Sequence, residues 1–262
     1  MRQILLLTDF SDCALNAIFV AIKLQQKNPC NFILLHTYRL PEENHAATIN
    51  LEKSLQAISK VSDCSQNEFS IQSICGDLAS VLRDFIPKYD LDLIIIGATG
   101  NSGAEEIFLG SNVVHVLNKI RNCPILVVPQ KYNFQSLGKI VLPTEYTHFF
   151  SKGQLRSLLS LAETWRSQIL IVHVAKAFEL SENQIANKNI LNDRIGDIPH
   201  SFHTASQTGT VAKTIEDFAS HQSADMICLV KYSHTFIKKL VQENVVRKVD
   251  FHTEIPLLVL PE

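Results

Sequence analysis

The sequence predicts an α/β protein made of two tandem domains, each a doubly wound, mainly parallel sheet of about five strands flanked by helices. Three observations lead to this fold class. The chain has 262 residues, which is comfortable for two domains of about 130 residues each. Blocks of sequence occur twice in the same order, and within each copy short apolar runs alternate with longer segments of helical period.

Four blocks of the amino-terminal half recur in the carboxy-terminal half, in the same order and at nearly constant separation. Residues 3–12 match 139–148, 31–38 match 167–175, 76–97 match 209–230 without a gap, and 123–129 match 255–261. Such a set is not expected by chance, so we expect two copies of one fold. A polar stretch at 130–138 separates the copies, and the expected domains are residues 1–132 and 133–262.

The alternation of patterns in the first copy predicts its elements in turn. We expect strands at 3–7, 32–36, 69–75, 93–97 and 125–128, with helices at 16–27, about 47–62, 78–88 and 112–120 between them. The first helix is expected because Ala17, Val20 and Leu24 recur at helical spacing. The strand at 93–97 is apolar throughout, as a sheet covered by helices on both faces requires. Ligands of such sheets bind beyond the carboxyl ends of the strands.

Composition excludes several classes of partner. With 46% hydrophobic and 19% charged residues the chain can bury a core, and a formal charge of −2 gives no electrostatic reason to expect nucleic acid or anionic lipid. No segment resembles a signal peptide or a membrane span. The six cysteines show no Cys-x-x-Cys pair, which favours free thiols in a reducing compartment. We therefore expect a cytoplasmic protein.

Catalytic and metal sites have little support in the sequence. His200 and His203 are the only close histidine pair, and no carboxylate pattern accompanies them, so no metal site is expected. His36 and His173 end equivalent strands, where a hydrogen-bonded structural role is expected. No Ser-His-Asp order or paired carboxylate spacing stands out, and we expect no catalytic residues.

A glycine-rich segment follows the fourth expected strand. Gly97 ends the strand, Gly100 follows, and Gly110 and Ser111 precede a helix that opens at Asn112. A loop that holds a polyphosphate needs exposed backbone N–H groups, the amino terminus of a helix and a hydroxyl donor, and this segment can supply all three. Two alternatives remain open: Ser111 or Asn112 caps the helix, and the glycines serve tight turns or close packing.

The spacing Gly-x-x-Gly, nine residues, Gly-Ser after the fourth strand resembles the nucleotide-binding pattern of the universal stress protein family. It is present here as Gly97, Gly100, Gly110 and Ser111. The segment "LLTDFSD" is similar to the family's first strand and its adenine-side Asp, and "ILLHT" is similar to its second strand. The resemblance covers nearly the whole chain twice, so it implies a tandem universal stress protein with the adenine nucleotide alpha hydrolase-like fold.

The resemblance implies that the first copy binds ATP. Thr8 and Asp9 would contact the adenosine, and the backbone at Thr37 would border the adenine. Gly97 and Gly100 would leave room for the ribose and the α-phosphate. The β- and γ-phosphates would meet Gly110, Ser111 and the N–H of Asn112. Mg²⁺ is expected with the triphosphate, held mostly by phosphate oxygens and water.

The second copy departs from this pattern. Val230, Ser233, Gln242 and Glu243 stand where the first copy has its three glycines and Ser111, and Glu145 replaces Asp9. We therefore expect no ATP binding in the family's manner there. The nearby basic residues form either an anion site of another kind or, as is commoner, a solvated face; they are Lys231, His234, Lys238, Lys239, Arg247 and Lys248.

These features lead to one functional expectation and two alternatives. We expect an ATP-binding stress-response or regulatory protein with an unknown protein partner and at most slow ATP hydrolysis, not an enzyme. The family's last strand pairs across a two-fold axis, which implies an intramolecular pseudo-dimer or a homodimer. One alternative is a scaffold or interaction module that binds no nucleotide; the other is a true ATPase, for which no candidate base is visible.

Overall fold

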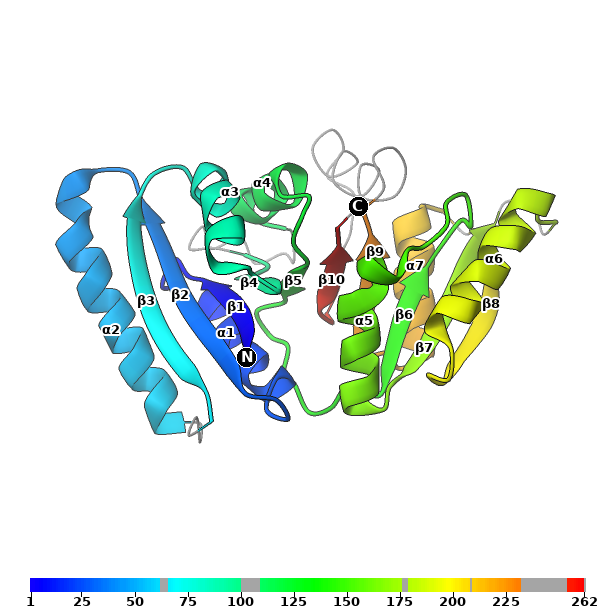
Figure 1. Ribbon diagram of the computed structural model, residues 1–262, viewed down its shortest axis with the longest axis horizontal. Coiled ribbons are helices and arrows are strands. Elements are labelled where there is room, and N and C mark those ends of the chain that lie inside the picture. The colour runs from blue at the N-terminus through cyan, green and yellow to red at the C-terminus, as the bar shows by residue number, and fades with distance from the viewer. Residues whose placement is uncertain (62–65, 100–108, 176–178, 208, 232–253, 262) are drawn as a thin grey trace. The chain divides into compact units, whose positions relative to one another are not determined.

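The computed structural model describes the chain except for residues 62–65, 100–108, 176–178, 208, 232–253 and 262. It divides into two compact units, Met1–Phe134 and Gln135–Glu262. Each unit is a parallel sheet with helices packed on it, drawn from blue to green and from green to red in Figure 1. Among the described residues no helix is long and apolar enough to cross a membrane.

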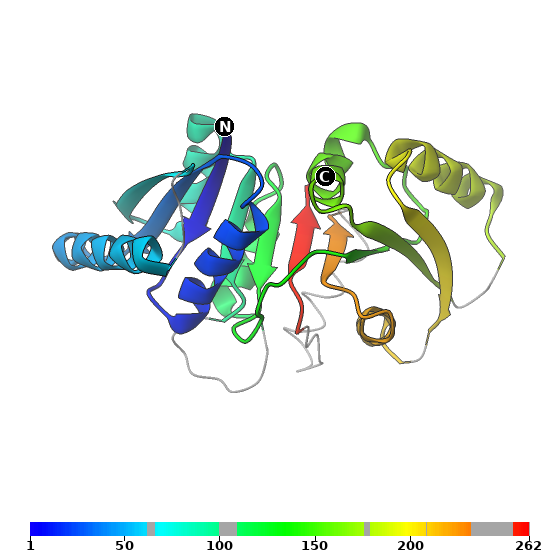
Figure 2. The same cartoon turned by 90° about the horizontal axis from the view of Figure 1, so that it is seen from below.

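The first unit holds five strands in the order β3-β2-β1-β4-β5, and every strand pair within it is parallel. Its strands are β1 (Arg2–Leu7), β2 (Cys30–Tyr38), β3 (Glu68–Cys75), β4 (Leu93–Gly97) and β5 (Ile125–Val128). Its helices are α1 (Asp12–Leu24), η1 (Pro41–Glu43), α2 (Asn44–Val61), α3 (Leu78–Tyr89) and α4 (Ser111–Lys119). Figures 1 and 2 show α1 and α3 on opposite faces of the sheet.

The second unit repeats this topology in the order β10-β9-β6-β7-β8, again with parallel pairs. Its strands are β6 (Lys139–Pro143), β7 (Gln168–Ala175), β8 (His200–Ser206), β9 (Met226–Val230) and β10 (Leu257–Leu260). Its helices are α5 (Lys152–Trp165), α6 (Glu182–Ile195) and α7 (Val211–His221), with α5 and α7 on opposite faces of the sheet (Figure 2). The expected fold class, two doubly wound α/β domains in tandem, is confirmed.

The core follows from the apolar strands. Every residue of β4 is buried, and so is every residue of β9, because helices cover both faces of a parallel sheet. In the first unit the chain direction across the sheet reverses at β1, which pairs with β2 on one side and β4 on the other. This reversal leaves a crevice beyond the carboxyl ends of β1 and β4.

The start of α1 differs from the expectation. The apolar pattern predicts a helix from residue 16, but α1 begins at Asp12 because the Ser11 side chain accepts a hydrogen bond from Ala14 N. The expected start was late because the periodic apolar residues lie inside the helix, one turn after its cap. The end of β2 also lies two residues beyond its expected end, at Tyr38, since its pairing with β3 continues to Cys75.

Asp225 ties the start of β9 to the start of β6. Its Oδ2 atom accepts hydrogen bonds from Gly138 N at 2.8 Å and from Lys139 N at 2.9 Å.

Replacing Asp225 with Ala leaves both N–H groups without their acceptor, so we expect the free energy of unfolding to fall by about 1–2 kcal/mol. The single tryptophan of the chain, Trp165, lies in the same unit, so its fluorescence during urea unfolding measures the loss. An unchanged urea midpoint would contradict this account; Asp225→Asn, which keeps one acceptor oxygen, is expected to lose less.

Candidate functional site

A cavity of about 240 Å³ opens at the carboxyl ends of β1, β2 and β4 in the first unit. Residues from these strand ends and from the starts of three helices line it: Leu7, Thr8, Asp9, Ala14, Leu35, His36, Thr37, Leu78, Ile96, Gly97, Thr99, Gly110, Ser111, Asn112 and Val113. The residues that the sequence predicts for the nucleotide site all line this cavity, as far as the structure describes them. Gly100, the remaining member, lies outside the described residues.

The turn between β1 and α1 fixes Asp9 at the wall. Thr8 N donates to Leu35 O at 3.0 Å, and Thr8 Oγ1 accepts from Phe10 N at 3.0 Å. This second bond holds Phe10 in a left-handed backbone conformation, with φ of 66°. Asp9 Oδ1 accepts from Ser11 N at 3.1 Å and from Ser11 Oγ at 2.5 Å. The carboxylate is therefore held in place by the residue that caps α1.

His36 braces the same turn from β2. Its Nδ1 lies 2.8 Å from Thr8 O, and because a carbonyl oxygen can only accept, Nδ1 carries the proton. The imidazole ring packs on Phe10 with ring centroids 4.4 Å apart. His173 makes the equivalent bond to Thr144 O at 3.0 Å in the second unit. Both histidines thus have the hydrogen-bonded structural role expected from their positions.

Gly97 has a packing reason for lacking a side chain. A Cβ atom at Gly97 would lie 2.9 Å from both the carbonyl carbon and the Sγ of Cys13, and 3.0 Å from Cys13 O. These distances are well inside van der Waals contact, so α1 can approach β4 this closely only over a glycine. The close-packing interpretation therefore holds for Gly97, which also forms part of the cavity wall.

The amino terminus of α4 is open toward the cavity. The side chains of Ser11, Asp77, Ser151, Ser181 and Thr210 cap α1, α3, α5, α6 and α7. The N-cap of α4 is Gly110, which has no side chain, so the interpretation of Ser111 or Asn112 as the cap is wrong. Gly110 N donates to Ala98 O at 2.7 Å, and the first intrahelical bond runs from Val114 N to Gly110 O.

The N–H groups of Ser111, Asn112 and Val113 consequently have no hydrogen-bond partner among the residues that the structure describes. All three residues line the cavity. Among the described lining residues, Asp9 and His36 are the ones with ionisable side chains, and no lysine or arginine is among them. The attraction for an anion at this wall therefore comes from backbone N–H groups and the helix dipole.

The second unit keeps the turn but fills its surroundings. Tyr146 N donates to Thr144 Oγ1 at 3.0 Å, and Tyr146 has φ of 53°, as Phe10 does in the first unit. Tyr146 is only 2% exposed, and burial raises the pKa of its hydroxyl above the ordinary value. Two side chains of α6, Gln184 and Asn187, donate to the carbonyl oxygens of Glu145 and Tyr146 at 2.8 Å.

Part of the expected difference between the two copies lies outside the described residues. Val230, in place of Gly97, is the buried last residue of β9. Ser233, Gln242 and Glu243 lie outside the described residues, as do His234 and the rest of the basic cluster beyond Lys231. Their effect on the second unit stays a prediction from the sequence.

Other chemistry-bearing groups make ordinary protein contacts. Within the described ranges no three His, Cys, Asp or Glu side chains are grouped as a metal site. His203 hydrogen-bonds to Ser201 and His200 to Asn192 and Ile198 O. The described cysteines are free thiols, Cys64 lying outside the described residues. Burial raises the pKa of Cys123 to about 12 and that of Cys228 further, so both stay protonated thiols.

The fold and the cavity together define a doubly wound α/β protein with its candidate ligand site at the sheet's topological switch point. Residues 1–129, which lie within the first unit, match the model of the Universal stress protein family, and this unit belongs to that family. The universal stress protein MJ0531 of Methanocaldococcus jannaschii is 29% identical over 139 residues, which cover 48% of this chain and 81% of that protein.

Solved structures resemble the whole chain. A universal stress protein from Archaeoglobus fulgidus has a TM-score of 0.67 at 19% identity, with 99% of this chain and 98% of that chain covered. A functionally unknown protein from Pseudomonas aeruginosa PAO1 has a TM-score of 0.61 at 17% identity and covers 100% of this chain and 92% of its own. At these identities the matches establish the fold of both units and nothing about ligands.

Proposed function

We propose that the chain is a regulatory universal stress protein that binds one ATP, in its first unit. The observation that carries this proposal is the uncapped start of α4, where three consecutive backbone N–H groups open on a cavity that also holds the Asp9 turn. A triphosphate supplies the anion for the helix terminus, and the adenosine lies against Thr8 and Asp9. Cytoplasmic location and an unidentified protein partner belong to the same proposal.

The proposed contacts follow the sequence with one refinement. Thr8 and Asp9 contact the adenosine, the Thr37 backbone borders the adenine, and Gly97 and Gly100 lie along the ribose and α-phosphate. Because Gly110 N–H is bonded to Ala98 O, the β- and γ-phosphates rely on the N–H groups that follow it and on the Ser111 hydroxyl. Mg²⁺ bound to the triphosphate needs no protein ligand if phosphate oxygens and water complete its shell.

We propose binding with at most slow hydrolysis because the ionisable groups on the described wall already have structural partners. Asp9 Oδ1 is bonded to Ser11, and His36 Nδ1 to Thr8 O. A general base must reach the attacking water, and neither group is free to leave its partner without loosening the turn. Nucleotide occupancy would act instead by favouring one conformation or one partner. A pseudo-dimer of the two halves, or a homodimer, stays a prediction from the sequence.

Calorimetric titration of the full chain, stripped of nucleotide, with Mg·ATP tests the proposal. We expect saturable binding with a stoichiometry of about one per chain, and weaker binding of adenosine, which lacks the phosphates that meet α4. No saturable binding of ATP would overturn the proposal and leave the scaffold alternative. Two equivalent sites per chain would show that the second unit also binds.

A further inference from the structure

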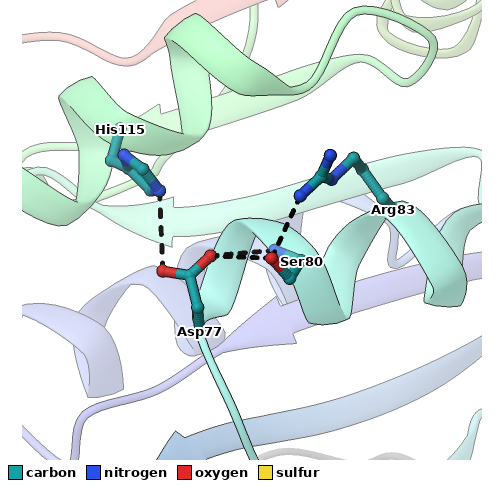
Figure 3. Close-up of polar contacts among 4 residues, drawn as sticks. All are labelled: Asp77, Ser80, Arg83 and His115. Atoms are coloured by element: carbon teal, nitrogen blue, oxygen red, sulfur yellow. Dashed lines mark hydrogen bonds and ion pairs between the residues drawn. The ribbon is translucent and has the colours of Figure 1, made fainter.

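A chain of four polar side chains joins the start of α3 to the middle of α4 (Figure 3). Asp77 Oδ2 accepts from Ser80 N and Ser80 Oγ, both at 3.1 Å, and so caps α3. Ser80 Oγ accepts from Arg83 Nη2 at 3.0 Å. On the other side of the carboxylate, Asp77 Oδ1 lies 3.6 Å from Nε2 of His115 on α4. One carboxylate thus serves both helices.

Capping alone does not require a carboxylate at this position. Thr210 aligns with Asp77 in the second copy and caps α7 through its hydroxyl, which accepts from Lys213 N at 3.1 Å. A neutral cap therefore suffices for the same turn in the same fold. What the first unit gains with Asp77 is a negative charge facing His115. The hydrogen bonds from Ser80, and the nearby His115, hold the pKa of Asp77 below its ordinary value, so the carboxylate is charged at neutral pH.

The pair adjoins residues that line the candidate site. Asp77 precedes Leu78, and His115 follows Ser111 by one helical turn; both Leu78 and Ser111 line the cavity. His115 Nε2 is shielded from solvent and has no hydrogen-bond partner within the described residues, although the side chain as a whole is 43% exposed. The Asp77 carboxylate lies 3.6 Å from this nitrogen, beyond hydrogen-bond distance. A proton on this nitrogen therefore adds a charge close to a wall that has no described lysine or arginine.

We propose that His115, held by Asp77, is a proton-sensitive positioning residue for the phosphates bound at the start of α4. The inference rests on the proposed function. A protonated imidazole attracts Asp77, which fixes α4 against α3, and it adds positive potential one turn from the phosphates. The other charged groups around it are Arg83, bonded to Ser80 on α3, and Lys119, one turn further along α4. Arginine and lysine side chains ordinarily stay charged near neutral pH. His36 lies on the cavity wall and is a second histidine near the bound nucleotide, so the part of the pH response due to His115 is the difference between the wild type and a variant that lacks the His115 imidazole.

The sign of the effect follows from charge. Protonated His115 favours the bound triphosphate, so a proton on His115 and ATP binding support each other. The two conditions to compare are pH 8 and pH 6, because histidine side chains in proteins ordinarily change charge within this range. As the pH falls from 8 to 6, we expect the ATP affinity of the wild type to rise about three- to fivefold relative to that of a variant without the His115 imidazole. Adenosine, which carries no phosphate, should show no such gain.

The test compares the wild type with His115→Gln and Asp77→Thr by calorimetry at pH 8 and pH 6. Asp77→Thr copies the cap of the second unit, keeps an acceptor for the start of α3, and removes the carboxylate oxygen that faces His115. Because the terminal phosphate of ATP also titrates in this range, each variant is compared with the wild type at the same pH. The ratio of wild-type to His115→Gln affinity should be near one at pH 8 and about three to five at pH 6. Asp77→Thr should lose most of the gain because its imidazole is no longer held.

The outcomes separate the two proposals. ATP binding with the same wild-type to His115→Gln ratio at both pH values overturns the role of His115 and leaves the ATP site standing. A gain that also appears with adenosine overturns it as well, because the effect would not involve phosphate. Absence of ATP binding by the wild type at both pH values overturns the proposed function itself. Circular dichroism of each variant verifies that the fold is retained.

Discussion

Replacing Ser111 with Glu is expected to reduce ATP affinity at least about 30-fold. The substitution copies the residue that the second half of the sequence has at this place, Glu243. A carboxylate at the first position of α4 would lie about 5 Å from bound phosphates, where each pair of like charges costs about 1–3 kcal/mol. It would also occupy the helix terminus that otherwise attracts the anion. Calorimetric titration with Mg·ATP measures the loss.

The matched control is Ser111→Gln, which has nearly the same shape without the charge. It removes the hydroxyl hydrogen bond, and we expect it to weaken ATP binding only about fivefold, corresponding to about 1 kcal/mol. Both variants should bind adenosine as the wild type does, since the change lies at the phosphate end. Equal ATP affinities of the Glu and Gln variants would show that no phosphate lies near Ser111.

Adding a methyl group at Gly97 is expected to destabilise the first unit by about 1–3 kcal/mol. The new Cβ would lie 2.9 Å from the carbonyl carbon of Cys13 and 3.0 Å from its oxygen, and neither backbone atom can move without shifting α1. Chemical denaturation of Gly97→Ala, followed by circular dichroism, measures the change. Cys13→Ala in the same chain should restore only part of the stability, because it removes the Sγ contact and leaves the two backbone contacts.

Gly153→Ala is the control for this substitution. The same methyl group at Gly153 has Ser151 Oγ, at 3.9 Å, as its nearest neighbour, and it lies in the first turn of α5. Because alanine favours a helix over glycine, we expect no loss and a gain of up to about 1 kcal/mol. Equal effects of the two alanine substitutions would contradict the close approach of α1 to β4.

The sequence predicts the parts of the structure that depend on local pattern. Apolar runs without alternation identify the buried strands, and the repeat identifies two copies of one topology. The family resemblance selects site residues far apart in the chain, from Thr8 to Asn112, and the described ones among them line a single cavity. This was possible because the carboxyl ends of parallel strands meet at one edge of a sheet, whatever the lengths of the helices between them.

Contacts between helices could not be predicted in this way. The pair of Asp77 and His115 depends on how α3 and α4 pack, and no short-range pattern encodes that distance. The reason for Gly97 likewise depends on where α1 crosses β4. The sequence left two alternatives open at the start of α4, an exposed helix terminus or a cap by Ser111 or Asn112. Both residues are good capping residues, and their type alone does not show that Gly110 takes the cap position.

The left-handed aromatic turn after the first strand has a consequence for finding ligand sites in related sequences. Phe10 and Tyr146 adopt it with the same threonine and histidine supports, although only the first half of the chain carries the glycine spacing. The first strand and the turn after it therefore belong to the fold of each half, whether or not that half carries the glycine spacing. A survey that counted binding sites from that signature alone would overcount them, and the residue at the start of the fourth helix is the better diagnostic.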